Sequence, residues 1–345
     1  MSPQDARERS EGRSGPVTTE STMGAYEPSD DAIVQLARRH GLDPLAPSAA
    51  SIQYLDQAIE RVARAYLTAS PAELTEEVRL HVAWVRRLLD NSRAPAQHHR
   101  LYVQFGYLTG ILAQLSLAQG GHDATQGYCA AAMQAADEAG DGQLRAWILS
   151  IQAMLAAYTN RHQDVIDLTG AGLQATGQAA SATAVKLTSL QARAHAVLGD
   201  RQAAEAALAR ARQTTAQVHP EEQERGLFAF PEEKLASHEG QVWLQLDAPE
   251  RAQKPLRRAL HLLDSAIGAR RSPVDQAMVR LHLARSHAEL GQFDEARQRA
   301  EEALALHHQR PVDHTRRRAD ELATLLKPYG ESEATQKILH ELTRA

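Results

Sequence analysis

The stretch that decides the fold runs from Asp275 to Leu306 and reads DQAMVRLHLARSHAELGQFDEARQRAEEALAL. Apolar residues recur at helical spacing in its first half and again in its second half, and the pattern breaks between them at Gly291. Small residues such as Ala284 and Ala296 leave no bulk between the two halves, so their backbones can approach closely. The stretch therefore predicts two short amphipathic helices joined by a turn.

This helix pair resembles the tetratricopeptide repeat, which has a period of about 34 residues. The residues that fill the positions of the repeat pattern are Leu283, Ala284, His287, Ala296, Ala300 and Ala303. Aligning further copies by their turn residue places the five turns at Gly120, Asn160, Gly199, Asp247 and Gly291.

Small residues dominate three columns of this alignment. Seven positions before the turns stand Ala113, Ala153, Ala192, Gly240 and Ala284. Five positions after them stand Thr125, Val165, Ala204, Ala252 and Ala296. Twelve positions after them stand Ala132, Gly172, Ala211, Ala259 and Ala303. This agreement predicts an all-α fold, a right-handed α-solenoid of five tetratricopeptide-like helix hairpins over residues 105–310.

The interval between the third and fourth turns is the longest, because it contains an insertion at residues 218–231. Two interpretations of this insertion stay open. It could be a loop that covers one edge of the groove and places Lys234 at a ligand. Alternatively, Phe228 and Phe230 staple a longer first helix onto the preceding unit.

The flanking parts of the chain predict three further segments. Residues 1–30 lack periodic apolar positions and are expected to form a disordered tail. Residues 31–104 predict an N-terminal helical segment, with a short helix stopped at Gly41, a helix capped by Ser51, and helices opened by Ser70-Pro71 and by Pro95. Residues 311–345 predict C-terminal capping helices, the last of which runs to Leu342.

Composition limits the functional classes. The chain is 43% hydrophobic but only 4% aromatic, which favours helices rich in alanine and leucine. Its net charge of −5 gives no general attraction to nucleic acid or to anionic membranes. Cys129 is the single cysteine, which excludes an internal disulfide. Without a signal sequence or an apolar run of membrane-spanning length, we expect a soluble, cytoplasmic protein.

A second resemblance covers residues 51–342. The strings that carry it are SIQYL from Ser51, VRRLLD from Val85, ADEAGDGQLRAWILSIQAMLAAY from Ala136 and LFAFPE from Leu227. The chain resembles the C-terminal repeat domain of actinobacterial XRE-type transcriptional regulators. The resemblance implies a sensing or protein-interaction array, related to the peptide-binding repeat domains of bacterial quorum-sensing regulators.

The chain departs from those regulators at its N-terminal side. A helix-turn-helix domain needs about 60 patterned residues, whereas only a tail and one short helix precede the array. A recognition helix after Gly41 would contain Pro44 and Pro47. Direct DNA binding is therefore not expected, and a cryptic DNA-reading segment within residues 31–90 stays the alternative.

Catalytic and metal-binding patterns are missing. The sequence contains no Walker A loop, no G-x-S-x-G elbow and no H-E-x-x-H motif, so we predict no enzyme, no cofactor and no metal. His282 and His287 are spaced by five residues, which does not suit two metal ligands on one helix. The histidines are interpreted as solvated helix ends, and Arg316-Arg317-Arg318 as a solvated helix face.

The concave groove is the predicted ligand site. Positions thirteen, ten and six residues before each turn should face it, and long cations recur there in an otherwise acidic protein. The groove residues are Tyr107, Gln114, Trp147, Ser150, Met154, Lys186, Ser189, Arg193, Lys234, Ser237, Gln241 and Arg285. We predict a regulatory protein that binds a peptide, a protein segment or a small anionic effector there. An assembly scaffold that uses its outer surfaces is a further alternative, and the chain could form a homodimer.

Overall fold

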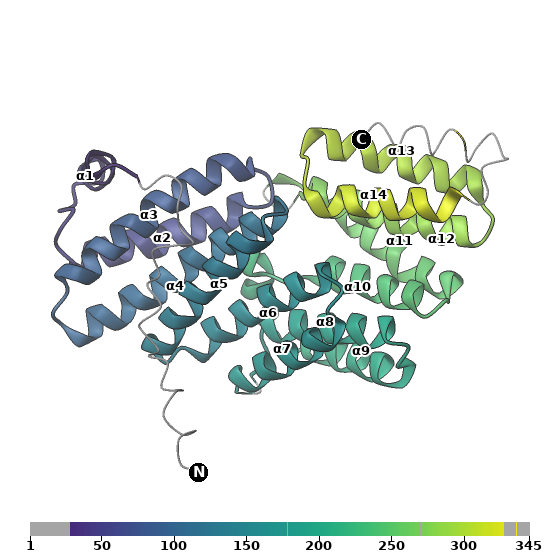
Figure 1. Cartoon of the computed structure of the whole chain (residues 1–345), viewed down its shortest axis with the longest axis horizontal. Coiled ribbons are helices and arrows are strands. Elements are labelled where there is room, and N and C mark those ends of the chain that lie inside the picture. Colours follow the sequence, from purple (N-terminus) through teal and green to yellow (C-terminus); the bar gives the residue numbers. More distant parts are fainter. Residues whose placement is uncertain (1–27, 178, 269–270, 328–335, 337–345) are drawn as a thin grey trace, which may run out of the picture.

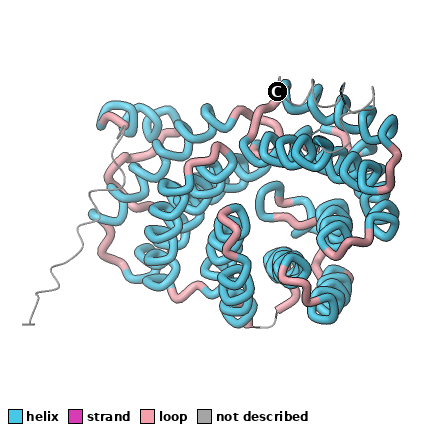
Figure 2. Tube along the Cα trace, turned by 45° about the vertical axis from the view of Figure 1, so that its right-hand side comes forward, coloured by secondary structure: helices cyan, strands magenta, loops and turns pink. Residues whose placement is uncertain are grey.

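The structure, a computed structural model, describes residues 28–177, 179–268, 271–327 and 336. Every regular element in these parts of the chain is a helix (Figures 1 and 2). The α-helices are α1 (Asp30–Arg39), α2 (Ala49–Ala65), α3 (Pro71–Asn91), α4 (Pro95–Ala118), α5 (His122–Ala139), α6 (Gly142–Tyr158), α7 (His162–Ala175), α8 (Ala182–Val197), α9 (Arg201–Thr215), α10 (Glu232–Gln245), α11 (Pro249–Ser265), α12 (Pro273–Glu289), α13 (Phe293–Gln309) and α14 (Asp313–Leu326). Two short 3₁₀-helices, η2 (Pro220–Glu224) and η3 (Gly226–Phe228), lie between α9 and α10. The last expected helix, to Leu342, and nearly all of the expected tail over residues 1–30 lie outside the described residues.

Five consecutive hairpins form the body of the protein: α4–α5, α6–α7, α8–α9, α10–α11 and α12–α13. The five predicted turns are confirmed, because each predicted residue lies between the two helices of one hairpin and adopts a positive φ. In each turn the amide of the next residue bonds to the carbonyl five residues earlier, at 2.9–3.0 Å. This shared bond closes the end of the first helix, and asparagine and aspartate tolerate its left-handed geometry at Asn160 and Asp247.

The small-residue columns form the contacts between paired helices. All fifteen of their residues are buried. The apolar cores follow one another along the chain, with one core under α1 to α6, another from α8 to α12 and a third under α12 to α14. Such local cores are typical of a solenoid, in which each unit packs mainly on its neighbours. The all-α fold of sequential helix hairpins is therefore as the repeat pattern predicts.

Gly240 shows how tightly one hairpin is packed. A Cβ atom on this residue would lie 2.4 Å from Cγ of Leu256. We expect Gly240→Ala to lower the free energy of unfolding by about 1–3 kcal/mol, because α10 and α11 would have to move apart. Gly170→Ala is the matched control: Gly170 is also helical but has no atom within 4 Å of the added Cβ, and should gain up to about 1 kcal/mol. Urea unfolding measures both, and equal changes would contradict the packing account.

The N-terminal helices agree with the sequence in part. Ser70 precedes α3, and Pro71 and Pro95 open α3 and α4 as predicted. Ser51 was the wrong cap for α2: Ser48 caps the helix, and the Ser51 hydroxyl donates to the carbonyl of Ala46 at 3.1 Å. The predicted boundary between residues 104 and 105 falls inside α4.

Two further observations concern the N-terminal helices. Residues 41–48 are not helical, so the segment after Gly41 does not form the second helix of a DNA-reading helix-turn-helix. In addition, α4 is long and apolar enough to cross a membrane by length and composition, contrary to the expectation from sequence. However, 72% of its most apolar window is buried inside the protein, as in the core helix of a soluble protein.

Candidate functional site

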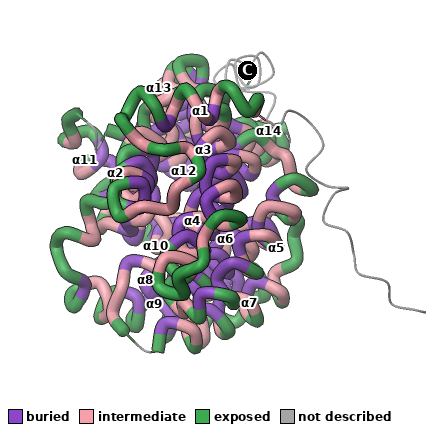
Figure 3. The backbone as a smooth tube through the Cα atoms, turned by 90° about the vertical axis from the view of Figure 1, so that its left-hand side faces the viewer, coloured by how far each residue is buried: buried purple, intermediate pink, exposed green. Residues whose placement is uncertain are grey.

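A cavity of about 860 Å³ lies on the inner side of the array. Its wall comes mainly from the first helices of the hairpins, α4, α6, α8, α10 and α12, together with α14. Figure 2 shows the helices curving around this inner side, and Figure 3 shows that buried residues gather towards the middle of the molecule. The predicted concave surface is therefore a cavity with walls contributed by all five hairpins and by α14.

The C-terminal end of α2 closes one part of the cavity. Tyr66 and Leu67, which follow α2, line the wall, and the Arg310 guanidinium donates hydrogen bonds to both of their carbonyl oxygens. Nearby, Nη1 of Arg317 in α14 donates to the carbonyl of Tyr158 at 2.8 Å, and its guanidinium lies 4.3 Å from the centre of the Tyr158 ring. The segment from Arg310 into α14 thus contacts the end of α2 and the end of α6.

The insertion at residues 218–231 closes the cavity from another direction. Arg225 forms a salt bridge with Glu60 of α2. Gly226 lies so close to α2 that a Cβ atom would stand 2.3 Å from the carbonyl oxygen of Ala63. Next to these contacts, Leu227 lines the cavity wall. The insertion and α2 therefore meet here although they are far apart in the chain. Arg225 and Glu60 are separated by 165 residues.

The two phenylalanines of the insertion have different roles. The ring of Phe228 packs edge-on against Tyr107 and Trp147, with centroid separations of 5.3 and 5.0 Å. Phe230 packs with Val185 of α8 and with α9, which is the stapling contact onto the preceding unit. Phe230 also lines the cavity. The insertion thus combines both interpretations. Phe228 covers part of the groove, and Phe230 packs the start of α10 onto the preceding hairpin.

The structure brings eight of the twelve predicted groove residues to the cavity wall. They are Gln114, Met154, Lys186, Arg193, Lys234, Ser237, Gln241 and Arg285. The other four, Tyr107, Trp147, Ser150 and Ser189, lie outside the cavity lining. All five residues six positions before a turn line the wall, so this column marks the inner face most reliably.

The four exceptions have physical causes. Phe228 covers Tyr107 and Trp147, so the insertion fills the groove over the first two hairpins. Ser150 and Ser189 are fully buried, so their side chains do not reach the cavity. The Ser150 hydroxyl donates to the carbonyl of Trp147 at 2.6 Å within its own helix.

Positive charge dominates the cavity wall. Seven lysine and arginine side chains line it, against four aspartate and glutamate side chains. Lys186 and Arg193, two turns apart on α8, form no hydrogen bond or salt bridge with another described residue, whereas Lys234 has Asp275 at 3.9 Å. Burial, and after it the charge of Lys234, lowers the pKa of Lys186 to about 7. Burial and then Arg318 lower the pKa of Arg193 to about 10. Two half-buried basic side chains without an ion-pair partner among the described residues favour the capture of an anion.

Three histidines line the same cavity: His238, His282 and His314. The sequence analysis did not predict them as groove residues. His282 of α12 is 4% exposed, and its Nε2 has no hydrogen-bond partner. His238 of α10 and His314 of α14 each have an unpartnered Nδ1. Burial lowers the pKa of all three, to about 4 for His314, so they are neutral near pH 7 and offer unpaired nitrogens to a ligand. In the part of the chain that the structure describes, no three His, Cys, Asp or Glu side chains are placed to share a metal ion.

Part of this set had a detectable signal in the sequence. His238 and His282 both stand nine positions before a turn, so the repeat alignment places them in one column.

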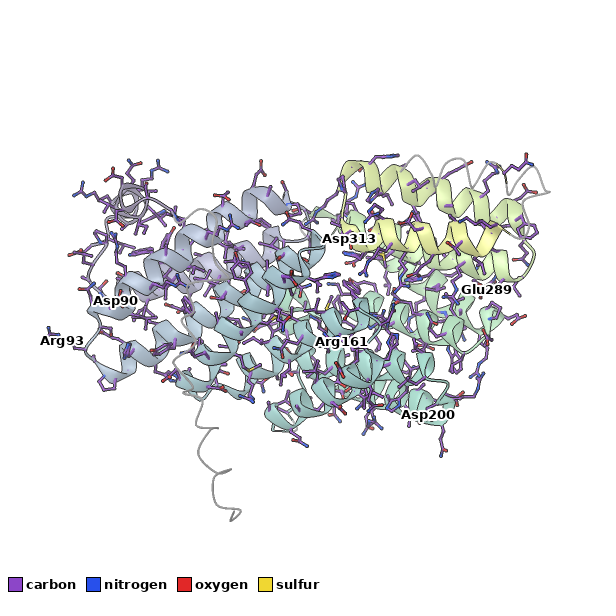
Figure 4. The ribbon with its side chains drawn as sticks, viewed as in Figure 1. Asp90, Arg93, Arg161, Asp200, Glu289 and Asp313 are labelled. Atoms are coloured by element: carbon purple, nitrogen blue, oxygen red, sulfur yellow. The ribbon has the colours of Figure 1, made fainter. Side chains whose placement is uncertain are left out.

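Arg317 and Arg318 had no such signal in the sequence. The interpretation of residues 316–318 as a solvated face was wrong for these two arginines, because both line the cavity. Arg316 is exposed and paired with Asp313 at 2.9 Å. Figure 4 shows Asp313 at the start of α14, and Arg161, Asp200 and Glu289 at hairpin ends.

The fold and the cavity define a helical-repeat protein with a positively charged cavity on its inner side. The chain matches no model of a known protein family and no curated protein. One solved structure with a similar fold is that of BtubC (BKLC) from P. vanneervenii, at 17% sequence identity and a TM-score of 0.49, over 70% of this chain and 92% of that chain.

Proposed function

We propose that this protein is a non-catalytic binding protein that captures an anionic ligand in its concave cavity and serves in cytoplasmic regulation. One observation carries the proposal: Lys186 and Arg193 face the cavity from α8 without a carboxylate partner among the described residues. Removing much of an unpaired cation from water is costly, and a bound anion would offset this cost. The regulatory role rests on the resemblance to the repeat domains of transcriptional regulators.

The unpaired cations sit on a rigid support. α8 packs against α6, α7 and α10 as well as against its own partner, α9. Ser181 caps the helix by accepting a hydrogen bond from the amide of Ala184 at 3.2 Å. A helix held by four neighbours fixes the backbone positions of both cations, which lowers the ordering cost of binding.

Isothermal titration with three anionic probes tests the proposal: sodium phosphate, decanoate and a glutamate-rich decapeptide. We expect at least one of them to bind the wild-type protein with one site, and the double variant Lys186→Met/Arg193→Met to bind it at least about tenfold more weakly. Methionine keeps most of the volume and removes the charge. Lys254→Met, on the exposed face of α11, is the matched control and should bind as wild type.

Two outcomes would count against anion capture. One is that none of the three probes binds the wild-type protein. The other is that the double variant binds as tightly as the control, which would place the binding elsewhere. A protein partner that binds equally to all variants would instead favour the assembly scaffold.

A further inference from the structure

We propose that the cavity takes a small amphipathic organic anion, with its oxyanion group at Arg193 and His282 and its apolar body against the inner faces of α6, α8 and α12. This inference rests on the proposed anion capture and narrows its ligand class. The contrasting ligand, an elongated peptide laid along the groove, is treated as an outcome of the test. Three observations favour the small anion: the polar groups that converge, the apolar wall beside them, and the contacts at two edges of the cavity.

The polar groups come from separate helices and have unused hydrogen-bonding capacity. Arg193 of α8 forms no hydrogen bond or salt bridge with another described residue. His282 of α12 is 4% exposed and keeps an unpartnered Nε2 at the cavity wall. The positive charge of Arg193 contributes to lowering the pKa of both His282 and His238. The three side chains therefore lie near one another along the cavity wall. A guanidinium beside neutral imidazoles can hold a carboxylate or phosphate by charge-assisted hydrogen bonds.

An apolar wall lies within one or two helical turns of these groups. Leu190 stands three residues before Arg193 on α8, and Met278 stands four residues before His282 on α12, so both share a helix face with the polar residue. Met154 of α6 lines the same cavity. The flexible methionine side chains can adapt to a hydrocarbon chain or a ring. The wall therefore suits a ligand with one charged end and an apolar body.

Contacts at two edges of the cavity stand in the way of an elongated ligand. Arg310 binds the carbonyls after α2 on one side, and Arg225 and Gly226 contact α2 on the other. Phe228 fills the groove over the first two hairpins. A peptide that followed the inner helices would have to displace these contacts. The remaining volume of about 860 Å³ is in the range of small-molecule sites, which is roughly 300–1,000 Å³.

The test uses the full chain in isothermal titration with decanoate as the amphipathic anion. Acetate keeps the carboxylate without the apolar body, and decyltrimethylammonium keeps the chain with the opposite charge. We expect decanoate to bind at least about tenfold more tightly than either, and more tightly than the glutamate-rich decapeptide. Arg193→Met and His282→Leu should each weaken decanoate binding by about tenfold. His282→Gln, which keeps a side-chain donor, should recover part of this loss and controls for a folding defect, with thermal unfolding measured for each variant.

The outcomes separate this inference from the proposed function. If the decapeptide binds, loses affinity in Lys186→Met/Arg193→Met, and decanoate does not bind, anion capture stands and the small amphipathic ligand is wrong. If decanoate binds equally to wild type, Arg193→Met and His282→Leu, the head-group assignment is overturned. If no anion binds at all, both proposals fall.

Discussion

Replacement of Gly226 by alanine is expected to lower the free energy of unfolding by about 3 kcal/mol and to release the insertion from α2. Gly226 has a φ of +59°, and an added Cβ would stand 2.3 Å from the Ala63 carbonyl oxygen and 2.8 Å from Cα of Arg64. The neighbouring atoms belong to the backbone of a buried helix and have little room to move. The strained φ and the backbone clash therefore act together.

The matched control isolates the clash. Gly140, between α5 and α6, has nearly the same φ, +60°, but no atom within 4 Å of an added Cβ. Gly140→Ala should cost only the conformational term, about 1–2 kcal/mol. Urea unfolding gives the two free energies, and amide hydrogen exchange over residues 218–231 reports the release of the insertion. Equal destabilisation, or unchanged exchange in Gly226→Ala, would show that the insertion does not depend on this contact.

Local features of the fold could be predicted from the sequence. The turn residues Gly120, Asn160, Gly199, Asp247 and Gly291 recur with small residues at fixed distances, and a helix hairpin is determined by contacts within about 40 residues of chain. The same periodicity identified the column from Gln114 to Arg285 that lines the cavity. Periodicity therefore gives the hairpins and their inner face.

Long-range closure could not be predicted in this way. The contact between Arg310 and the carbonyl of Leu67 joins residues 243 positions apart, and no repeat column contains either residue. The insertion likewise carries Phe228 to Tyr107 across more than a hundred residues, which converts two predicted groove residues into covered ones. These contacts depend on the accumulated curvature of the array, which the pattern of a single unit does not specify.

Anion affinity is expected to fall between about pH 7 and 9, with a slope that approaches tenfold per pH unit above the pKa of Lys186, and Lys186 is the cause. The pKa of Lys186 in the free protein lies at about 7, and a nearby anion favours the charged ammonium and raises that pKa. Above about pH 7 the anion must therefore bind together with a proton. The affinity decreases until the pH passes the pKa of Lys186 in the complex.

Other groups around Lys186 do not explain such a slope. Burial lowers the pKa values of His238, His282 and His314 from their usual range, so these side chains titrate below this window. Burial raises the pKa of Cys129, which faces Lys186 from α5, to about 12, so its thiol stays protonated. Lys234 acts on Lys186 from α10 as a second positive charge. We therefore assign the change in affinity between pH 7 and 9 to Lys186, whose pKa lies at about 7.

The stability of the free protein should increase with pH, whereas anion affinity decreases with pH. The usual pKa of lysine is 10.5, so between about pH 7 and 10 the unfolded chain carries a proton on Lys186 that the folded chain has lost. The contribution of this residue to stability therefore increases with pH in that interval, while anion affinity decreases.

Titrations with decanoate and urea unfolding, both at pH 6, 7, 8 and 9, measure the two trends. Lys186→Met should flatten both, Lys186→Arg should bind without pH dependence because its charge persists, and Lys254→Met should retain the wild-type slopes. A wild-type affinity that stays constant from pH 7 to 9, or equal slopes in Lys186→Met, would show that the charge of Lys186 does not act on the bound anion.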